Sequence, residues 1–432
     1  MKFTPFSGSI LHSFSFKSSP FHIIMIVSAV IMLLQSCFFN GEVALENQVI
    51  QKGNNNLVGS SACKSCHSDI YNDFIKTSHK SSTMSPTKEN IRGSFEEGKN
   101  SYLFNAYDGV LMKHLDSGLY QVNFYDSKFV KAYPFDMVIG SGTRGQSYAY
   151  WVNNQLFQLP ISYYTNEDAW SNSPGYPDGI ANFGRVIRQQ CLGCHSSNAD
   201  LITDAKHNFE SFEKSSIVYG INCERCHGPG GNHVDLFTQN PGFTGENLIV
   251  NAHDLSNQQQ LDACAICHSS SESTLTTAST FATGDTLDHS RMQSNLIKKV
   301  DVHGNQYGLL LESKCFTTVK TMTCSTCHDP HQDQSNELVM FSQKCMECHM
   351  PETDKFCKMT HELEISVLKQ NCIDCHMPNT ESQILNVKLD TKETNTPAVI
   401  RSHLIKVYPA QSNDITALFM KTKLESSIQP TN

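Results

Sequence analysis

The chain has 432 residues, of which 17 are cysteine and 19 are histidine, and its formal net charge is −9. A hydrophobic fraction of 39% is too high for a disordered chain and too low for a polytopic membrane protein, and the cysteines are too sparse for a small disulfide scaffold. The excess of acidic over basic residues also argues against a general nucleic-acid-binding protein, which usually has a basic surface.

The first 36 residues have the organisation of an export signal. Two lysines precede an apolar run, Phe21 to Leu34, that is too short to span a bilayer, and no acidic residue appears before Glu42. The run ends in Leu-Gln-Ser-Cys, which resembles a bacterial lipobox. We therefore predict a lipoprotein signal peptide over residues 1–36 and lipidation of Cys37, which places the protein in the periplasm or cell envelope. A plain signal peptide and a retained transmembrane anchor are the alternatives.

Seven copies of the pattern Cys-x-x-Cys-His follow, and they contain fourteen of the 17 cysteines. On one helical turn, positions i, i+3 and i+4 share a face, so two thiols can bond the two haem vinyl groups while the imidazole lies over the iron. This is the attachment signature of c-type haem. The seven motifs are Cys63, Cys66 and His67; Cys191, Cys194 and His195; Cys223, Cys226 and His227; Cys264, Cys267 and His268; Cys324, Cys327 and His328; Cys345, Cys348 and His349; and Cys372, Cys375 and His376.

Zinc ribbons and thioredoxin-like redox sites also use Cys-x-x-Cys, but neither requires a histidine after the second cysteine. We therefore predict seven covalently attached haem c groups. Six of the motifs lie within residues 191–376, which leaves too little chain per haem for an ordinary aliphatic core. The porphyrins would supply much of the buried apolar surface, so we expect the haem-free chain to fold poorly.

The predicted fold class is a mainly α and irregular multihaem cytochrome c with a small β-meander between the first and second haems. Alternating apolar and polar residues between 95 and 165 predict strands, with turn signals at Asp108-Gly109, Asp116-Ser117-Gly118 and Asp126-Ser127. The predicted segments are a tether (37–58), a first-haem segment (59–94), a β-rich insertion (95–180), a domain holding haems two to seven (181–405) and a polar C-terminal tail (406–432).

Ten histidines outside the motifs and the signal are candidates for the second axial position of the irons. They are His79, His114, His207, His233, His253, His289, His303, His331, His361 and His403. His303, His361 and His403 lie between apolar residues, and His233 follows Gly-Pro-Gly-Gly, where small residues allow the backbone to approach a porphyrin. A phosphate-binding loop is the rival interpretation of those glycines, but the Gly-Lys-Ser/Thr ending is missing.

From about residue 59 to 405 the chain resembles the multihaem cytochromes related to cytochrome c-554, which include proteins with doubled CxxCH motifs. The resemblance rests on VGSSACKSCHSDIYNDFIKTSHKSS, on IGSGTRGQSYAYWVNNQLFQLPISYY and on GINCERCHGPGGNHV, DVHGNQYGLLLESKCFTTVKTMTCSTCHDPH, CIDCHMP and IRSHLIKVYP. It implies that distal iron ligands are His79, His233, His303, His331 and His403. Cys315 fits a Cys-aromatic pattern of some relatives, and a disulfide between Cys315 and Cys357 is left open.

Two functions fit these observations. The first is an electron carrier that passes electrons between redox partner proteins through closely packed haems, because bis-histidine irons have no open site. The second is a multihaem oxidoreductase that acts on a small nitrogen or sulfur compound at one five-coordinate haem, with groups such as Arg144, Arg185, Arg188 or Arg225 lining an anion pocket. All seven motifs end in histidine, which favours the carrier. We expect partners with a basic docking patch, a membrane contact through the lipid anchor, and no nucleic acid.

Overall fold

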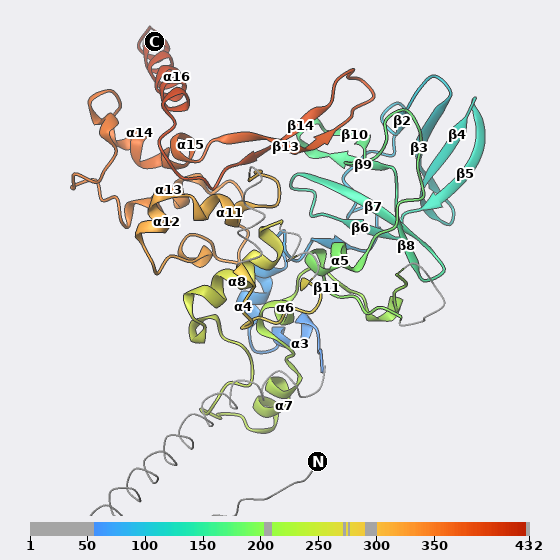
Figure 1. Ribbon diagram of the computed structural model, residues 1–432, viewed down its shortest axis with the longest axis horizontal. Helices are drawn as coiled ribbons and strands as arrows, with labels where there is room; N and C mark the ends of the chain where they lie inside the picture. The colour runs from blue at the N-terminus through green and yellow to red at the C-terminus, as the bar shows by residue number, and fades with distance from the viewer. Residues whose placement is uncertain (1–55, 203–209, 271–273, 275–276, 290–299, 429–432) are drawn as a thin grey trace, which may run out of the picture. The chain divides into compact units, whose positions relative to one another are not determined.

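The computed structural model describes residues 56–202, 210–270, 274, 277–289 and 300–428 (Figure 1). The predicted signal peptide, the lipidation site Cys37 and the candidate ligand His207 lie outside the described residues. Within the described ranges, no helix is both long and apolar enough to cross a bilayer.

The β-rich insertion begins with a four-stranded antiparallel meander. It consists of β2 (Ser101–Leu103), β3 (Asp108–Leu115), β4 (Gly118–Tyr125) and β5 (Lys128–Pro134) in sequential order. Asp126 and Ser127 form the two-residue turn between β4 and β5 with φ angles of 49° and 59°, as favoured hairpin turns require. Two of the three predicted turns therefore join these strands, whereas Asp108-Gly109 starts β3 itself.

A second sheet in this region has six strands. Its order is β1 (Thr83–Met84), β6 (Met137–Ile139), β7 (Gly145–Val152), β9 (Ile161–Tyr164) and β10 (Ala169–Asn172), with β8 (Gln155–Gln158) paired to β7. The strands thus begin earlier and end later than the residues 95–165 that alternation indicates. Residues of both sheets share one core rich in aromatic side chains, in which Tyr148 is fully buried and Trp170 is 4% exposed.

The remainder of the described chain is built from short helices, 3₁₀ turns and two small hairpins, as the sequence predicts. The helices are α3 (Ser60–Lys64), α4 (Ser68–Phe74), α5 (Gln189–His195), α6 (Cys223–His227), α7 (Gly231–Gln239), α8 (Asn257–His268), α11 (Gln306–Leu311), α12 (Lys314–Thr318), α13 (Leu338–Met346), α14 (Ile365–Gln370), α15 (Cys372–His376) and α16 (Pro409–Ile428). The 3₁₀ turns are η1 (Thr165–Glu167), η2 (Lys214–Ser216), η3 (Ala252–Asp254), η4 (Cys324–Thr326) and η5 (Lys358–His361).

Two hairpins join the helical part to the sheets. The first pairs β11 (Ser196–Asn198) with β12 (Val218–Tyr219), directly after the second motif. The second pairs β13 (Asn379–Val387) with β14 (Thr396–Arg401), and Lys388 next to it accepts a backbone hydrogen bond from Asn172 of β10. The tail after residue 405, which the sequence marks only as polar, forms the long helix α16.

Candidate haem-binding site

One continuous cavity of about 3270 Å³ runs through the helical part of the chain, and all 21 cysteines and histidines of the seven motifs line it. A pocket for one small ligand usually has a volume of roughly 300–1,000 Å³, and packed protein interiors have few voids larger than a water molecule. A hollow of this size therefore fits several large cofactors.

Each motif lies on a short helical turn. The backbone N–H of His67 donates to the carbonyl of Cys63 at 2.9 Å, and the same i→i−4 bond joins His328 to Cys324 and His349 to Cys345, both at 3.0 Å. The turn places the two thiols and the imidazole of a motif on one face, as covalent haem attachment requires.

The imidazoles of these motifs pair with histidines from distant parts of the chain. Ring centres are separated by 6.5 Å for His67 and His233, 6.2 Å for His268 and His79, 5.9 Å for His227 and His331, and 5.9 Å for His328 and His403. A metal–imidazole bond is about 2 Å long and the ring centre lies about 1.1 Å behind the nitrogen, so two imidazoles on one iron have centres about 6 Å apart. The four pairs fit haem iron between them.

His303 is a further distal candidate near a motif histidine. Burial lowers the pKa of His195, and His303 is near enough for its charge to lower that pKa further. Both histidines line the cavity. The structure thus places four predicted distal ligands, His79, His233, His331 and His403, opposite four motif histidines, and it places His303 near His195.

The second ring nitrogen of several of these histidines has a fixed partner. Nδ1 lies 2.7 Å from the Val250 carbonyl in His227, 2.8 Å from the Lys355 carbonyl in His349 and 2.9 Å from the Lys406 carbonyl in His376. An Nδ1–H that donates to a carbonyl leaves the lone pair on Nε2, which is the tautomer that binds a metal.

Burial also keeps these imidazoles neutral. It lowers the pKa of His268 to about 4, with further lowering by the imidazoles of His79, His328 and His195. Burial, together with His328 and His268, also lowers the pKa of His403 to about 4. Because only neutral imidazole binds a metal, these histidines are ready to ligate iron at neutral pH.

Thiols of different motifs touch one another across the cavity. Cys63 lies next to Cys223, Cys267 next to Cys194, Cys264 next to Cys324, and Cys345 next to Cys372, close enough for the second thiol of each pair to shift the pKa of the first. Correspondingly, α3 packs against α6, α8 against η4, and α13 against α15. Cys226 is also close enough to Cys267, and Cys327 to Cys345, for their charges to affect the pKa of the partner thiol.

His79 is held in place by a close contact between the first-haem segment and the chain before the third motif. The carbonyl of His79 accepts a hydrogen bond from the backbone N–H of Ile221 at 2.9 Å. The neighbouring Gly220 has φ +73°, and a Cβ there would overlap the carbonyl oxygen of Lys80. Glycine is therefore required at this position for His79 to reach the cavity.

The motif residues between the cysteines also matter, and the sequence gives little sign of it. Glu224 is 6% exposed, and its carboxylate accepts from the backbone N–H groups of Val58, Gly59 and Gly230 at 2.8 to 2.9 Å. The guanidinium of Arg225 donates to the carbonyls of Phe281, Gly193 and Ala278. Arg225 thus connects the second and third motifs through backbone contacts, and it lines the cavity, as Arg144 and Arg185 also do.

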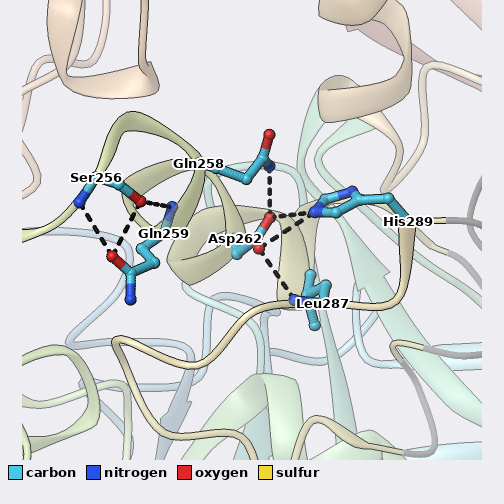
Figure 2. Close-up of polar contacts among 6 residues, drawn as sticks. All are labelled: Ser256, Gln258, Gln259, Asp262, Leu287 and His289. Atoms are coloured by element: carbon cyan, nitrogen blue, oxygen red, sulfur yellow. Dashed lines mark hydrogen bonds and ion pairs between the residues drawn. The ribbon is translucent and has the colours of Figure 1, made fainter. Parts of the chain in front are cut away.

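The helix that carries the fourth motif is braced by a buried carboxylate (Figure 2). Asp262 of α8 is fully buried, and it accepts hydrogen bonds from Gln258 at 2.8 Å and from the backbone N–H of Leu287 at 3.0 Å. Nε2 of His289 lies 3.0 Å from the same carboxylate. Ser256 and Gln259 form a capping box at the start of the helix. These contacts assign His289 to Asp262 rather than to an iron.

We expect the Asp262→Ala substitution to lower the free energy of unfolding of the haem-loaded protein by about 3 kcal/mol, because it removes a buried acceptor from the N–H of buried Leu287 and from the side chains of Gln258 and His289. Thermal unfolding followed by circular dichroism measures this. Asp414→Ala, at an exposed position of α16, is the matched control and should change stability by less than about 0.5 kcal/mol. Equal effects of the two substitutions would contradict a bracing role for Asp262.

The remaining candidates lie away from the paired imidazoles. His361 is 69% exposed, its Nε2 lies 3.2 Å from a Glu362 carboxylate oxygen, and it does not line the cavity. His114 is exposed on β3, and His253 is exposed on η3. Cys315 and Cys357 both line the cavity, with Cys315 near Cys348 of the sixth motif and Cys357 near Cys375 of the seventh.

Helical CxxCH turns around one shared cavity, with imidazoles paired across it, define a multihaem c-type cytochrome, and the chain is a protein of this class. Residues 176–228 match the family described as cytochrome c554 and c-prime. The chain is also 25% identical over 187 residues to the multiheme cytochrome MtrA of Shewanella baltica (strain OS185). The aligned region covers 39% of this chain and 54% of that protein. It thus spans about half the length of this curated relative.

A solved structure also aligns with most of the chain. It is the crystal structure of the outer cell wall cytochrome OcwA, with a TM-score of 0.49 and 18% sequence identity. The alignment covers 84% of this chain and 82% of that one.

Proposed function

We propose that the chain is an extracytoplasmic heptahaem electron carrier that passes electrons between redox partner proteins. The observation that supports this most directly is the set of four imidazole pairs around one cavity, because an iron held between two histidines has no site for a substrate. Covalently bound haem c supplies one-electron chemistry at each position. The protein supplies the attachment thiols, the axial imidazoles and the spacing between neighbouring haems.

The contacts between motifs order the haems. The first motif touches the third, the third lies beside the fourth, the fourth touches the fifth, the fifth lies beside the sixth, and the sixth touches the seventh. Among these thiol contacts of the described residues, the second motif touches only the fourth. We infer a main path that omits the second haem and a side branch that ends at it, with the fourth haem as the junction.

The proposed location follows from the sequence before residue 56. Removal of a signal peptide at Cys37 would take two lysines and no acid from the chain, which leaves a formal charge of −11. A lipid on Cys37 would attach the protein to a membrane, and residues 37–58 would be the tether. Mass spectrometry of the native protein tests this: an N-terminal peptide that starts at an acylated Cys37 is the expected result.

Haem quantification on the purified protein tests the carrier function. We expect seven haems per chain by the pyridine haemochrome assay and by intact mass. Low-temperature EPR should show that the irons of the first five motifs are low-spin. Fewer than seven haems, or high-spin irons among the first five motifs, would contradict the proposed carrier.

Electron transfer to a partner should depend on ionic strength. Each ferric haem core carries +1 and its two propionates carry −2, so seven haems take the charge of −11 to about −18 in the oxidised form, and a partner with a basic patch is attracted to this protein. Raising the salt from 0.01 M to 1 M shortens the screening length from about 30 Å to about 3 Å. We expect the second-order rate in stopped-flow experiments to fall at least about tenfold over that range. A rate that is independent of salt would exclude electrostatic docking.

A further inference from the structure

The last two motifs differ from the other five in what faces their histidines. His67, His227, His268 and His328 each have a second imidazole in position for the same iron, and His195 has the cavity-lining His303 near it. Within the residues that the structure describes, no such partner is found for His349 of the sixth motif or His376 of the seventh. Both nevertheless line the cavity with their motif thiols.

These two histidines are otherwise set up as iron ligands. Their Nδ1 atoms lie 2.8 and 2.9 Å from backbone carbonyls, so Nε2 is free for the metal. Cys345 and Cys372 lie next to each other and α13 packs against α15, so the two attachment sites adjoin. The difference from the other motifs therefore concerns the opposite side of the iron, the sixth coordination position.

The histidine that the sequence offers for this position is turned away. His361 belongs to η5 between the two motifs, but its side chain is 69% exposed and paired with Glu362. Met359 and Leu363, on either side of it, do line the cavity, whereas His361 does not. The turn thus presents the thioether of Met359 and the alkyl chain of Leu363 inward and its imidazole outward.

The surroundings of the two motifs contain several lysines. Lys344, Lys355, Lys358 and Lys406 line the cavity near the sixth and seventh motifs. The amine of Lys344 is paired with Glu347 at 2.9 Å, and that of Lys406 lies over the Tyr408 ring at 5.0 Å. This positive charge favours small anions over cations as ligands that enter here.

We propose that the haems of the sixth and seventh motifs keep an open sixth position that binds small exogenous ligands: diatomic molecules on ferrous iron and small anions on ferric iron. This inference rests on the proposed loading of all seven motifs with haem. In the order of motif contacts these haems end the main path, so the ligand-binding end of the protein lies opposite the first haem. The chain then combines a closed bis-histidine section with an open terminal pair.

The experiment uses the full haem-loaded protein and two probes, carbon monoxide and cyanide. Haem is counted first, because fewer than seven haems would contradict the proposed loading and not the open position. With seven haems present, we expect the reduced protein to bind about two equivalents of carbon monoxide. The oxidised protein should show a high-spin EPR signal of about two haems that cyanide removes. Seven haems with no carbon monoxide bound and only low-spin signals would overturn the proposal.

Two variants make the result specific. His403→Ala removes the imidazole opposite His328 and should raise carbon monoxide binding from about two to about three equivalents, which calibrates the assay. His361→Ala should leave the count of about two unchanged. If His361 does cap one of these irons, carbon monoxide binding will instead increase in the His361→Ala variant, and the proposal fails for that haem.

Discussion

Without covalent haem, the chain is expected to lose the cooperative structure of its helical part while keeping its β-rich insertion. The helical part surrounds a cavity of about 3270 Å³, and its largest described apolar cluster consists of only seven buried residues, among them Leu261, Phe281 and Tyr307. An unfilled hollow of this size removes the packing partners of its whole lining. Ordering the motif turns would then cost conformational entropy that no buried surface offsets.

The β-rich insertion has a different source of stability. Its core contains thirteen buried residues from both sheets, with Tyr148, Trp170 and Leu159 at or near full burial. None of these thirteen residues lies within a motif. Burial of large aromatic side chains contributes about 1.5–3 kcal/mol each, which is sufficient to keep the two sheets together.

The measurement is limited proteolysis with mass spectrometry on the chain in which all motif cysteines are replaced by serine, beside the haem-loaded wild-type chain. We expect a protected fragment that covers about residues 83–187 in the variant and protection up to α16 in the wild type. Circular dichroism should show loss of helix with retention of strand. A haem-free chain that unfolds in one sharp transition at the wild-type temperature would show that the haems contribute little to folding.

The sequence predicted the chemistry of the motifs better than their arrangement. Cys-x-x-Cys-His specifies a local turn, so its geometry follows from helical periodicity alone. The pairing of His79 with His268, or of His328 with His403, joins segments that are far apart in the chain, and no local pattern contains that information. The resemblance to known cytochromes supplied His79 and His403 as candidates but not their partners.

In the β-rich insertion, period-two alternation located the strands but did not identify the inner face. Gln121 of β4 is fully buried because its side chain both donates to the carbonyl and accepts from the N–H of Ile161. From the sequence alone, a buried polar residue whose hydrogen bonds are all made inside the protein cannot be distinguished from one that faces solvent. Asp262 was missed for the same reason, since its partner His289 comes from another segment.

The second large effect is expected at the fourth haem. Removing its attachment site with Cys264→Ala and Cys267→Ala should divide the remaining haems into the first and third, the isolated second, and the fifth to seventh. The division follows from the motif contacts, because Cys264 touches the fifth motif, Cys267 touches the second, and Cys226 of the third lies beside Cys267. Electron transfer through protein slows steeply with distance, so a gap of one haem should interrupt the path.

Removal of the second haem with Cys191→Ala and Cys194→Ala is the matched control, because it also deletes one haem but leaves the main path intact. In stopped-flow reduction by a protein donor that docks at one end, the control should have all six remaining haems in the fast phase. The variant without the fourth haem should have about two or three of its six haems in that phase. A small diffusible reductant should restore full reduction in both variants. Equal fast phases in the two variants would mean that another route bypasses the fourth haem, and the order inferred from the thiol contacts would be wrong.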